Sequence, residues 1–185
     1  MPAFPPSVCV FCGSRPGTNP AMMQCAAETG RMLARRGWRL VYGAGDIGLM
    51  GEVARATQAA GGATFGVIPT HLMQGEVART DLDALVVTET MHERKKVMFS
   101  NSSAIAVLPG GAGTLDEFFE VLTWAQIGLH AKPVVVLDQD GFWQPLLALL
   151  DHLVAQGFAA AALKALITVA RDVPAMETAL ARALA

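Results

Sequence analysis

The sequence has few residues of the kinds that carry redox or metal chemistry. Only three of its 185 residues are cysteine and four are histidine. They are too few and too scattered for a disulfide framework or for the ligand spacing of a zinc site. Cys9 and Cys12 form a C-x-x-C pattern, but they lie in an apolar segment typical of a buried strand, and no second pair follows. We therefore predict that these cysteines pack in the core and that the protein holds no metal.

The chain also lacks a long apolar run and an excess of basic charge. No apolar run reaches the roughly 18 residues that a membrane span needs, although 52% of the residues are hydrophobic. The net charge is −2 and the basic residues are scattered, whereas a nucleic-acid surface would gather them in a patch. The start of the sequence resembles no signal peptide. We expect a cytoplasmic protein that binds neither membrane nor nucleic acid, with its surplus apolar residues in a covered sheet or a subunit interface.

Short β-branched segments alternate with longer helical segments along the chain. This alternation predicts parallel strands with right-handed crossovers, hence a single doubly wound, Rossmann-like α/β domain over residues 1–185, with helices on both faces of a mostly parallel sheet. The predicted strands span residues 7–12, 38–42, 64–68, 84–89, 104–108, 133–137 and 165–170. The predicted helices span residues 20–36, 49–60, 91–101, 114–127 and 143–156, with a short helix at the end of the chain.

In such a fold, ligands bind at the carboxyl ends of the strands. Two glycine-rich loops are expected at this edge, and each is a candidate ligand site. Residues 43–48 read GAGDIG, a G-x-G-x-x-G pattern between a strand and a helix that is typical of dinucleotide sites. However, the next strand ends in GVIPT, without the acidic residue that would bind a ribose. The loop also follows the second predicted strand and not the first. We therefore favour a close approach to another ligand, or tight packing, over NAD binding.

The second loop, PGGAGT at residues 109–114, has features that suit an anion. Glycines let backbone N–H groups point at a ligand, Thr114 adds a hydroxyl, and the positive end of the helix dipole favours negative charge. No Gly-Lys-Ser/Thr follows, so this is not a Walker loop. A single phosphate, as in a nucleoside monophosphate, fits better than a triphosphate with magnesium. The plainer alternative is a helix start that only needed a tight turn.

Three carboxylates follow this loop, and a basic cluster precedes it. Glu117 and Glu120 are three residues apart and share a helix face, while Asp116 is expected to complement the helix dipole. The segment MHERKK carries Arg94, Lys95 and a further lysine on the helix that leads to the preceding strand. Adjacent helical residues point about 100° apart, so only one or two of these cations can reach the ligand edge.

At these residues the sequence resembles the LONELY GUY (LOG) family, long labelled "possible lysine decarboxylase". The family motif P-G-G-x-G-T-x-x-E corresponds to residues 109–117, and its Arg-Lys pair to Arg94 and Lys95. The segments VFCGSRPG, LVYGAGDIGLMG and LTWAQIGLHAKPVVVLD also follow in the family's order, so the resemblance covers nearly the whole chain. It implies a cytokinin riboside 5'-monophosphate phosphoribohydrolase that releases the free base and ribose 5-phosphate. It also implies a homodimer or larger assembly with no metal or cofactor.

The resemblance further implies which residues form the site. Catalysis would fall to Arg94 and Glu117. The implied substrate-binding residues are Glu76, Arg94, Lys95, Gly111, Ala112, Gly113, Thr114, Leu115, Asp116, Glu117 and Thr123. The chain departs from the family's usual residues at Ala112, where an aromatic residue or glycine is frequent, and at residues 43–48, where GGGSVG is commoner. Both departures bear on the fit of the base.

The predicted reaction is hydrolysis of the N-glycosidic bond of an N6-modified adenosine 5'-monophosphate. The Glu117 carboxylate would stabilise oxocarbenium-like charge on the ribose and position water. Arg94 would orient the substrate, because a guanidinium is a poor proton donor. Two alternatives stay open: a general AMP nucleosidase, and a non-catalytic protein that binds a phosphorylated ligand, as a molybdenum-cofactor carrier does. A decarboxylase would need a lysine suited to pyridoxal phosphate, and no lysine has that sequence context.

Overall fold

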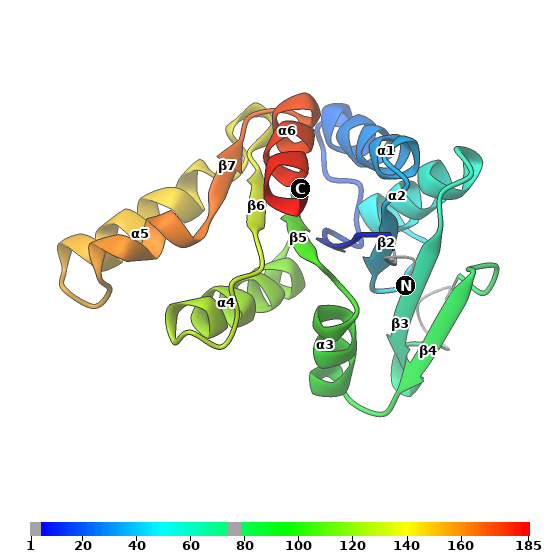
Figure 1. Ribbon diagram of the computed structural model, residues 1–185, viewed down its shortest axis with the longest axis horizontal. Helices are drawn as coiled ribbons and strands as arrows, with labels where there is room; N and C mark the ends of the chain where they lie inside the picture. The colour runs from blue at the N-terminus through cyan, green and yellow to red at the C-terminus, as the bar shows by residue number, and fades with distance from the viewer. Residues whose placement is uncertain (1–4, 74–78) are drawn as a thin grey trace.

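A computed structural model describes residues 5–73 and 79–185 of the chain (Figure 1). Within these residues seven strands form one sheet in the order β4-β3-β2-β1-β5-β6-β7, and all neighbouring strands are parallel. The strands are β1 (Ser7–Phe11), β2 (Arg39–Tyr42), β3 (Thr64–Pro69), β4 (Ala84–Thr88), β5 (Ala104–Val107), β6 (Val134–Leu137) and β7 (Thr168–Ala170). The chain builds outward from β1 in one direction through β2 and in the other through β5, so the predicted doubly wound fold is confirmed.

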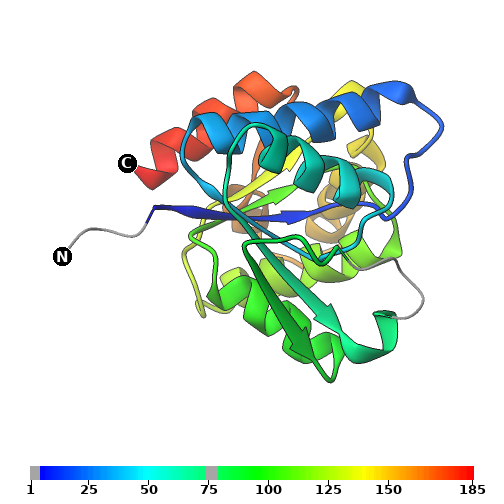
Figure 2. The same ribbon diagram turned by 90° about the vertical axis from the view of Figure 1, so that its right-hand side faces the viewer.

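Helices cover both faces of the sheet (Figure 2). They are α1 (Pro20–Arg35), α2 (Gly48–Ala59), α3 (Met91–Ser100), α4 (Ala112–Gln126), α5 (Gln144–Ala155) and α6 (Val173–Leu184). Because side chains alternate along a strand, β1 contributes to two separate core clusters. Val8 and Val10 pack with α1, α2 and α6. Cys9 and Phe11 pack with α3, α4 and α5, which explains why the central strands read as nearly continuous apolar runs.

The three cysteines behave as core residues. Cys9, Cys12 and Cys25 are all buried free thiols, as the sequence predicts for Cys9 and Cys12. Burial raises the pKa of each thiol, for Cys25 to about 12, so all three stay neutral near pH 7. Across residues 5–73 and 79–185, no cluster of three or more His, Cys, Asp or Glu side chains is placed to hold a metal ion. In the same part of the chain, no helix has the length and apolar character needed to cross a membrane.

Capping residues fix two of the helices that reach the ligand edge. Asn19 caps α1, since its side chain accepts a hydrogen bond of 2.9 Å from the Ala21 N–H. Helix α3 begins with a reciprocal capping box between Thr90 and Glu93. This box fixes the start of the helix that carries Arg94.

Two predicted boundaries were wrong. Helix α4 begins at Ala112 with Gly111 as its N-cap, two residues before the predicted start. Thr114 therefore lies within the first turn of the helix and not at its cap. The predicted strand at 165–170 is shorter, because Ala161–Leu166 forms a 3-10 helix before β7.

Candidate active site

A cavity of about 620 Å³ opens beside β1 and β5, where the strand order diverges. Its walls come from the loop after β1, the starts of α2 and α4, the first turns of α3, and the glycine-rich loop after β5. The volume lies within the range of small-molecule sites. Parallel α/β sheets bind their ligands at this edge because the strand-to-helix loops gather there.

The glycines of residues 109–114 have two different surroundings. A Cβ on Gly110 would overlap the Thr114 hydroxyl and lie 2.9 Å from the backbone nitrogen of Gly13. This glycine therefore serves a tight packing contact between two loops. A Cβ on Gly111 or Gly113 would meet no atom within 4 Å. These two glycines leave open space on the cavity side of the first turn of α4.

The N-terminus of α4 is available to an anion. No side chain among the described residues caps this helix. The N–H groups of residues 112–114 belong to the first turn, where a helix offers no carbonyl partner. They lie at the positive end of the helix dipole and beside the cavity. This arrangement can bind a phosphate or a carboxylate without any cation from the motif itself.

Arg94 is buried at the base of the cavity and held by backbone carbonyls. Its Nε donates to the Val67 carbonyl at 3.2 Å, and its Nη2 donates to the Gly43 carbonyl at 3.1 Å. A Cβ on Gly43 would overlap this guanidinium, so residue 43 must be glycine for Arg94 to occupy its place. Gly43 of the G-x-G-x-x-G pattern therefore serves tight packing, one of the two readings that the sequence favoured.

Glu117 faces Arg94 from α4. Its Oε1 lies 3.7 Å from Arg94 Nη1, and the residue is 8% exposed. Burial raises the pKa of Glu117 to about 7, although Arg94 acts in the opposite direction. A carboxyl group that titrates near neutrality inside a cavity is suited to accept or donate a proton during a reaction.

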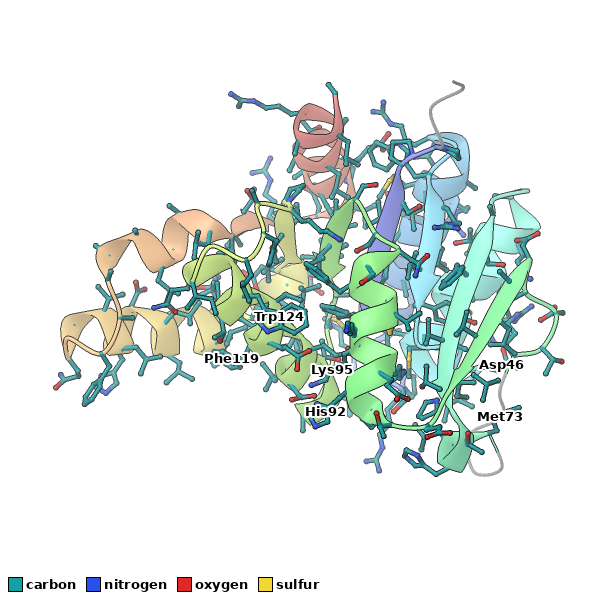
Figure 3. All side chains as sticks on the ribbon, turned by 60° about the horizontal axis from the view of Figure 1, so that its bottom comes forward. Asp46, Met73, His92, Lys95, Phe119 and Trp124 are labelled. Carbon is teal, nitrogen blue, oxygen red and sulfur yellow. The ribbon has the colours of Figure 1, made fainter. Side chains whose placement is uncertain are left out.

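Lys95 lies between α3 and α4 (Figure 3) and is not part of the cavity lining. Its ammonium Nζ lies 2.9 Å from Asp116 Oδ2 and 2.6 Å from Glu120 Oε2. The expectation that Asp116 complements the helix dipole was wrong. Because α4 begins at Ala112, Asp116 lies beyond the first turn, and it pairs with Lys95.

Of the site residues implied by the family resemblance, some line the cavity and others lie outside its lining. Those that line the cavity are Arg94, Gly111, Ala112, Gly113, Thr114 and Glu117. Those that lie outside its lining are Lys95, Leu115, Asp116 and Thr123. Leu115 is half-buried against the core, and Thr123 is exposed on α4. Glu76 falls outside the described residues.

Sequence reasoning assigned no role to several lining residues. Arg15 and Ser14 belong to the loop after β1, which the sequence placed at this edge without a function. An apolar wall is formed by Met22, Leu49, Met50, Leu72, Met91 and Phe142. The wall comes from segments scattered over the chain, so no local motif signals it. The position of the first loop beside the central strand is the signal that could have singled out Arg15.

The sequence of this chain is similar to those of known proteins. The family model for "Possible lysine decarboxylase" matches residues 50–180. A probable cytokinin riboside 5'-monophosphate phosphoribohydrolase of Oryza sativa subsp. japonica is 47% identical over 169 residues, which cover 91% of this chain and 74% of the relative. The Rhodococcoides fascians cytokinin riboside 5'-monophosphate phosphoribohydrolase is 43% identical over 91% of this chain and 86% of its own length. The chain belongs to the LONELY GUY family.

Solved structures share the fold of this LOG chain. A molybdenum cofactor carrier protein from Chlamydomonas reinhardtii superposes with a TM-score of 0.74 at 26% identity, over 97% of this chain and 98% of that one. The molybdenum cofactor binding protein of Rippkaea orientalis superposes with a TM-score of 0.75 at 22% identity, over 98% of each chain. In the LOG chain, the family's two motifs meet at the cavity, where Arg94 from one faces Glu117 from the other.

Proposed function

We propose that this protein hydrolyses the N-glycosidic bond of an N6-modified adenosine 5'-monophosphate, releasing a free cytokinin base and ribose 5-phosphate. The names of its relatives at 43% to 47% identity support this activity. The observation that carries the proposal is the buried pair of Arg94 and Glu117, 3.7 Å apart, at a cavity whose adjoining wall is the open N-terminus of α4. This pair brings a carboxyl that titrates near pH 7 close to a site suited to a phosphate.

The substrate phosphate would bind the backbone N–H groups of residues 112–114 and the Thr114 hydroxyl. Two arginines line the described part of the cavity, Arg15 and Arg94. The Arg94 guanidinium is already bound to two carbonyl groups and faces Glu117. Arg15 is exposed, and its long side chain can reach a ligand in the cavity that its own loop lines. Arg15 is therefore the cation that we assign to the phosphate.

The reaction requires a water molecule and a carboxylate. The oxygen of water bonds to the anomeric carbon as the bond from that carbon to the base breaks, and the leaving base takes a proton from solvent water. Ionised Glu117 would stabilise the positive charge that develops on the ribose and take a proton from the water. Arg94 stays protonated, so it would orient the carboxylate and the substrate rather than exchange protons.

The apolar wall supports a modified base. Met22, Met50, Met91 and Phe142 give the cavity lining flexible thioethers and an aromatic ring. Such a surface suits a purine that carries an apolar substituent. A general AMP nucleosidase would gain less from it, because unmodified adenine presents a polar amine at that position.

A non-catalytic carrier is the second candidate, favoured by the structural likeness to molybdenum cofactor carrier proteins. The position of Glu117 weighs against it. A buried carboxylate beside an anion site repels the anion and costs desolvation free energy. A protein that only binds a phosphorylated ligand gains nothing from that cost.

The lysines of the chain give no support to a decarboxylase. None of the four lysines lines the described cavity. Lys95 pairs with Asp116 and Glu120, Lys132 donates to the Ser102 carbonyl at 2.7 Å, and Lys164 pairs with an exposed aspartate. A Schiff-base enzyme would need a lysine inside the site.

We also propose a homodimer that uses the groove between α3 and α4. Phe99, Trp124 and Leu129 line this groove, and Leu129 is 68% exposed. Figure 3 shows His92 on α3 and Trp124 on α4 at its two sides. An apolar groove of this kind, in a chain with 52% hydrophobic residues, suits contact with a second copy. Equilibrium sedimentation at micromolar concentration should give twice the monomer mass. The cytoplasmic location remains a prediction.

One assay tests the proposed activity directly. The protein is incubated with isopentenyladenosine 5'-monophosphate or with AMP, and the products are separated by chromatography. We expect free base from both substrates, at a clearly higher rate from the modified one. Equal rates would favour the AMP nucleosidase. The carrier reading predicts binding of nucleotide but no free base from either.

A further inference from the structure

Lys95 is a buried cation between α3 and α4 that pairs with exposed Asp116 and partly buried Glu120. Lys95 is 6% exposed. Its ammonium contacts Asp116 at 2.9 Å and Glu120 at 2.6 Å, and both carboxylates belong to α4. Burial by itself lowers the pKa of Lys95, but the hydrogen bonds to Glu120 and Asp116 outweigh it, so the pKa is raised. Lys95 is thus charged near pH 7, and its charge is neutralised by α4.

The two adjacent cations of α3 have separate partners on α4. Arg94 faces Glu117, while Lys95 faces the residues that precede and follow Glu117 on the same helix surface. The Lys95 contacts, at 2.6 Å and 2.9 Å, are much closer than the 3.7 Å between Arg94 and Glu117. Among these ionic contacts between α3 and α4, those of Lys95 are the closest.

We infer that Lys95 is a positioning residue and not a substrate ligand: through Asp116 and Glu120 it fixes α4 against α3 and so sets Glu117 relative to Arg94. The inference rests on the proposed function, because it assigns Lys95 a task in that reaction. It departs from the role that the family motif implies for this position. To reach a ligand in the cavity, Lys95 would have to break both contacts and leave two carboxylates unpaired beside Glu117.

The same ion pairs set the charge around Glu117. The titratable groups that surround it come from three segments, namely Arg94 and Lys95 on α3, Asp116 and Glu120 on α4, and the thiols of Cys9 and Cys12 at β1. The thiols are neutral near pH 7 because burial raises their pKa. The two cations lower the pKa of Glu117, and the two neighbouring carboxylates raise it. Loss of the Lys95 charge alone therefore leaves the carboxylates uncompensated.

The effect of Lys95 on the pKa of Glu117 distinguishes a positioning residue from a substrate ligand. Lys95→Met should raise the pKa of Glu117 and move the acid limb of the kcat/KM profile to higher pH, because ionised Glu117 is the active form. We expect kcat at pH 7 to fall about tenfold, with KM for isopentenyladenosine 5'-monophosphate changed by less than about threefold. A neutral triple variant, Lys95→Met with Asp116→Asn and Glu120→Gln, should return the pH profile towards wild type, while kcat stays low because the ion pairs that position α4 are absent from it too.

The complementary double variant, Asp116→Asn with Glu120→Gln, leaves Lys95 charged and unpaired. It should move the acid limb to lower pH with KM unchanged, and it remains informative if Lys95→Met does not fold. The inference is overturned if Lys95→Met raises KM about tenfold with an unmoved pH profile. It is also overturned if the neutral triple variant recovers the wild-type kcat.

The pKa of Glu117 can also be measured by an NMR titration of its carboxyl carbon. This measurement does not depend on the proposed function. If the wild type releases no base from any nucleoside monophosphate, the proposed function fails. The Glu117 pKa should still rise in Lys95→Met and return in the neutral triple variant. A Glu117 pKa that is the same in all of these variants would contradict the inference, whatever the activity.

Discussion

Two glycine-rich loops join a strand to a helix at the same edge of the sheet, and Gly43 of the first has surroundings opposite to those of Gly111 and Gly113 of the second. In residues 43–48, a Cβ on Gly43 would overlap the Arg94 guanidinium. In residues 109–114, a Cβ on Gly111 or Gly113 would meet nothing within 4 Å. Gly43 of the first loop makes room for a protein side chain, whereas Gly111 and Gly113 of the second leave room for a ligand. The atoms around the missing Cβ, rather than the glycine pattern itself, separate the two roles.

The largest effect is expected at Gly43. The Gly43→Ala methyl group would displace Arg94 from its two carbonyl partners and from Glu117. We predict a loss of about 1000-fold in kcat/KM, as for removal of a main electrostatic group from an active site. The free energy of unfolding should fall by about 2 kcal/mol in urea titrations. If this variant keeps wild-type turnover, the first loop does not position Arg94.

The next largest effect is expected at Glu117, which faces Arg94 in the cavity. Its folded pKa of about 7 lies above the usual value of 4.5. The folded state therefore binds more protons than the unfolded state between these pH values, and stability falls as pH rises from 4.5 to 7. The loss from this group should be on the order of 3 kcal/mol at pH 8.

Urea titrations at pH 5 and pH 8 check this prediction. Glu117→Gln should reduce the pH dependence and be more stable than wild type at pH 8. The matched control is Glu89→Gln, since Glu89 is an exposed carboxylate, and its pH dependence should equal that of the wild type. Equal pH dependence in Glu117→Gln and wild type would mean that Glu117 has an ordinary pKa.

A smaller effect is expected at Gly113, which receives the same substitution as Gly43. The Gly113→Ala methyl group would project into the open space where we place the phosphate. We predict a rise of about tenfold in KM. The free energy of unfolding should stay the same or increase by about 0.5–1 kcal/mol, because alanine favours a helix more than glycine does. If Gly43→Ala and Gly113→Ala lowered the free energy of unfolding equally, the two glycines would not differ in their surroundings as we describe.

The smallest effect is expected at Arg15. Because this side chain is exposed, its interaction with the phosphate is screened by water. Arg15→Ala should raise KM for the nucleoside monophosphate by roughly fivefold, with kcat unchanged. The increase should shrink as salt is added. Arg31→Ala, which removes an exposed arginine of α1, is the control and should leave KM unchanged. A Gly113→Ala effect without an Arg15 effect would restrict phosphate binding to the backbone.

The sequence predicted the order of strands and helices because short β-branched segments alternate with longer helical segments along the chain. It did not predict the start of α4, since Ala112 and Gly113 have no local signal that distinguishes a loop from a first helical turn. That two-residue difference changed the role expected for Asp116. The partners of Lys95 also had to come from the structure, because they depend on how α3 and α4 pack.

The candidate site was predictable only where a motif is continuous. Residues 109–117 form such a motif, and most of them line the cavity. The apolar wall comes from segments that meet only in the folded chain, as Met22 and Phe142 illustrate. Gly43 shows the same limit, because the side chain that requires a glycine there is Arg94, 51 residues along the chain.

The central claim is that Arg94 and Glu117 act as a pair on a nucleoside monophosphate in this cavity. Single-turnover release of base from isopentenyladenosine 5'-monophosphate tests it most directly, with wild type, Glu117→Gln, Arg94→Ala and the double variant compared. We predict that each single variant loses at least about 100-fold in rate and that the double variant is little worse than either, as for residues that act as a unit. Full turnover in both single variants would contradict the account.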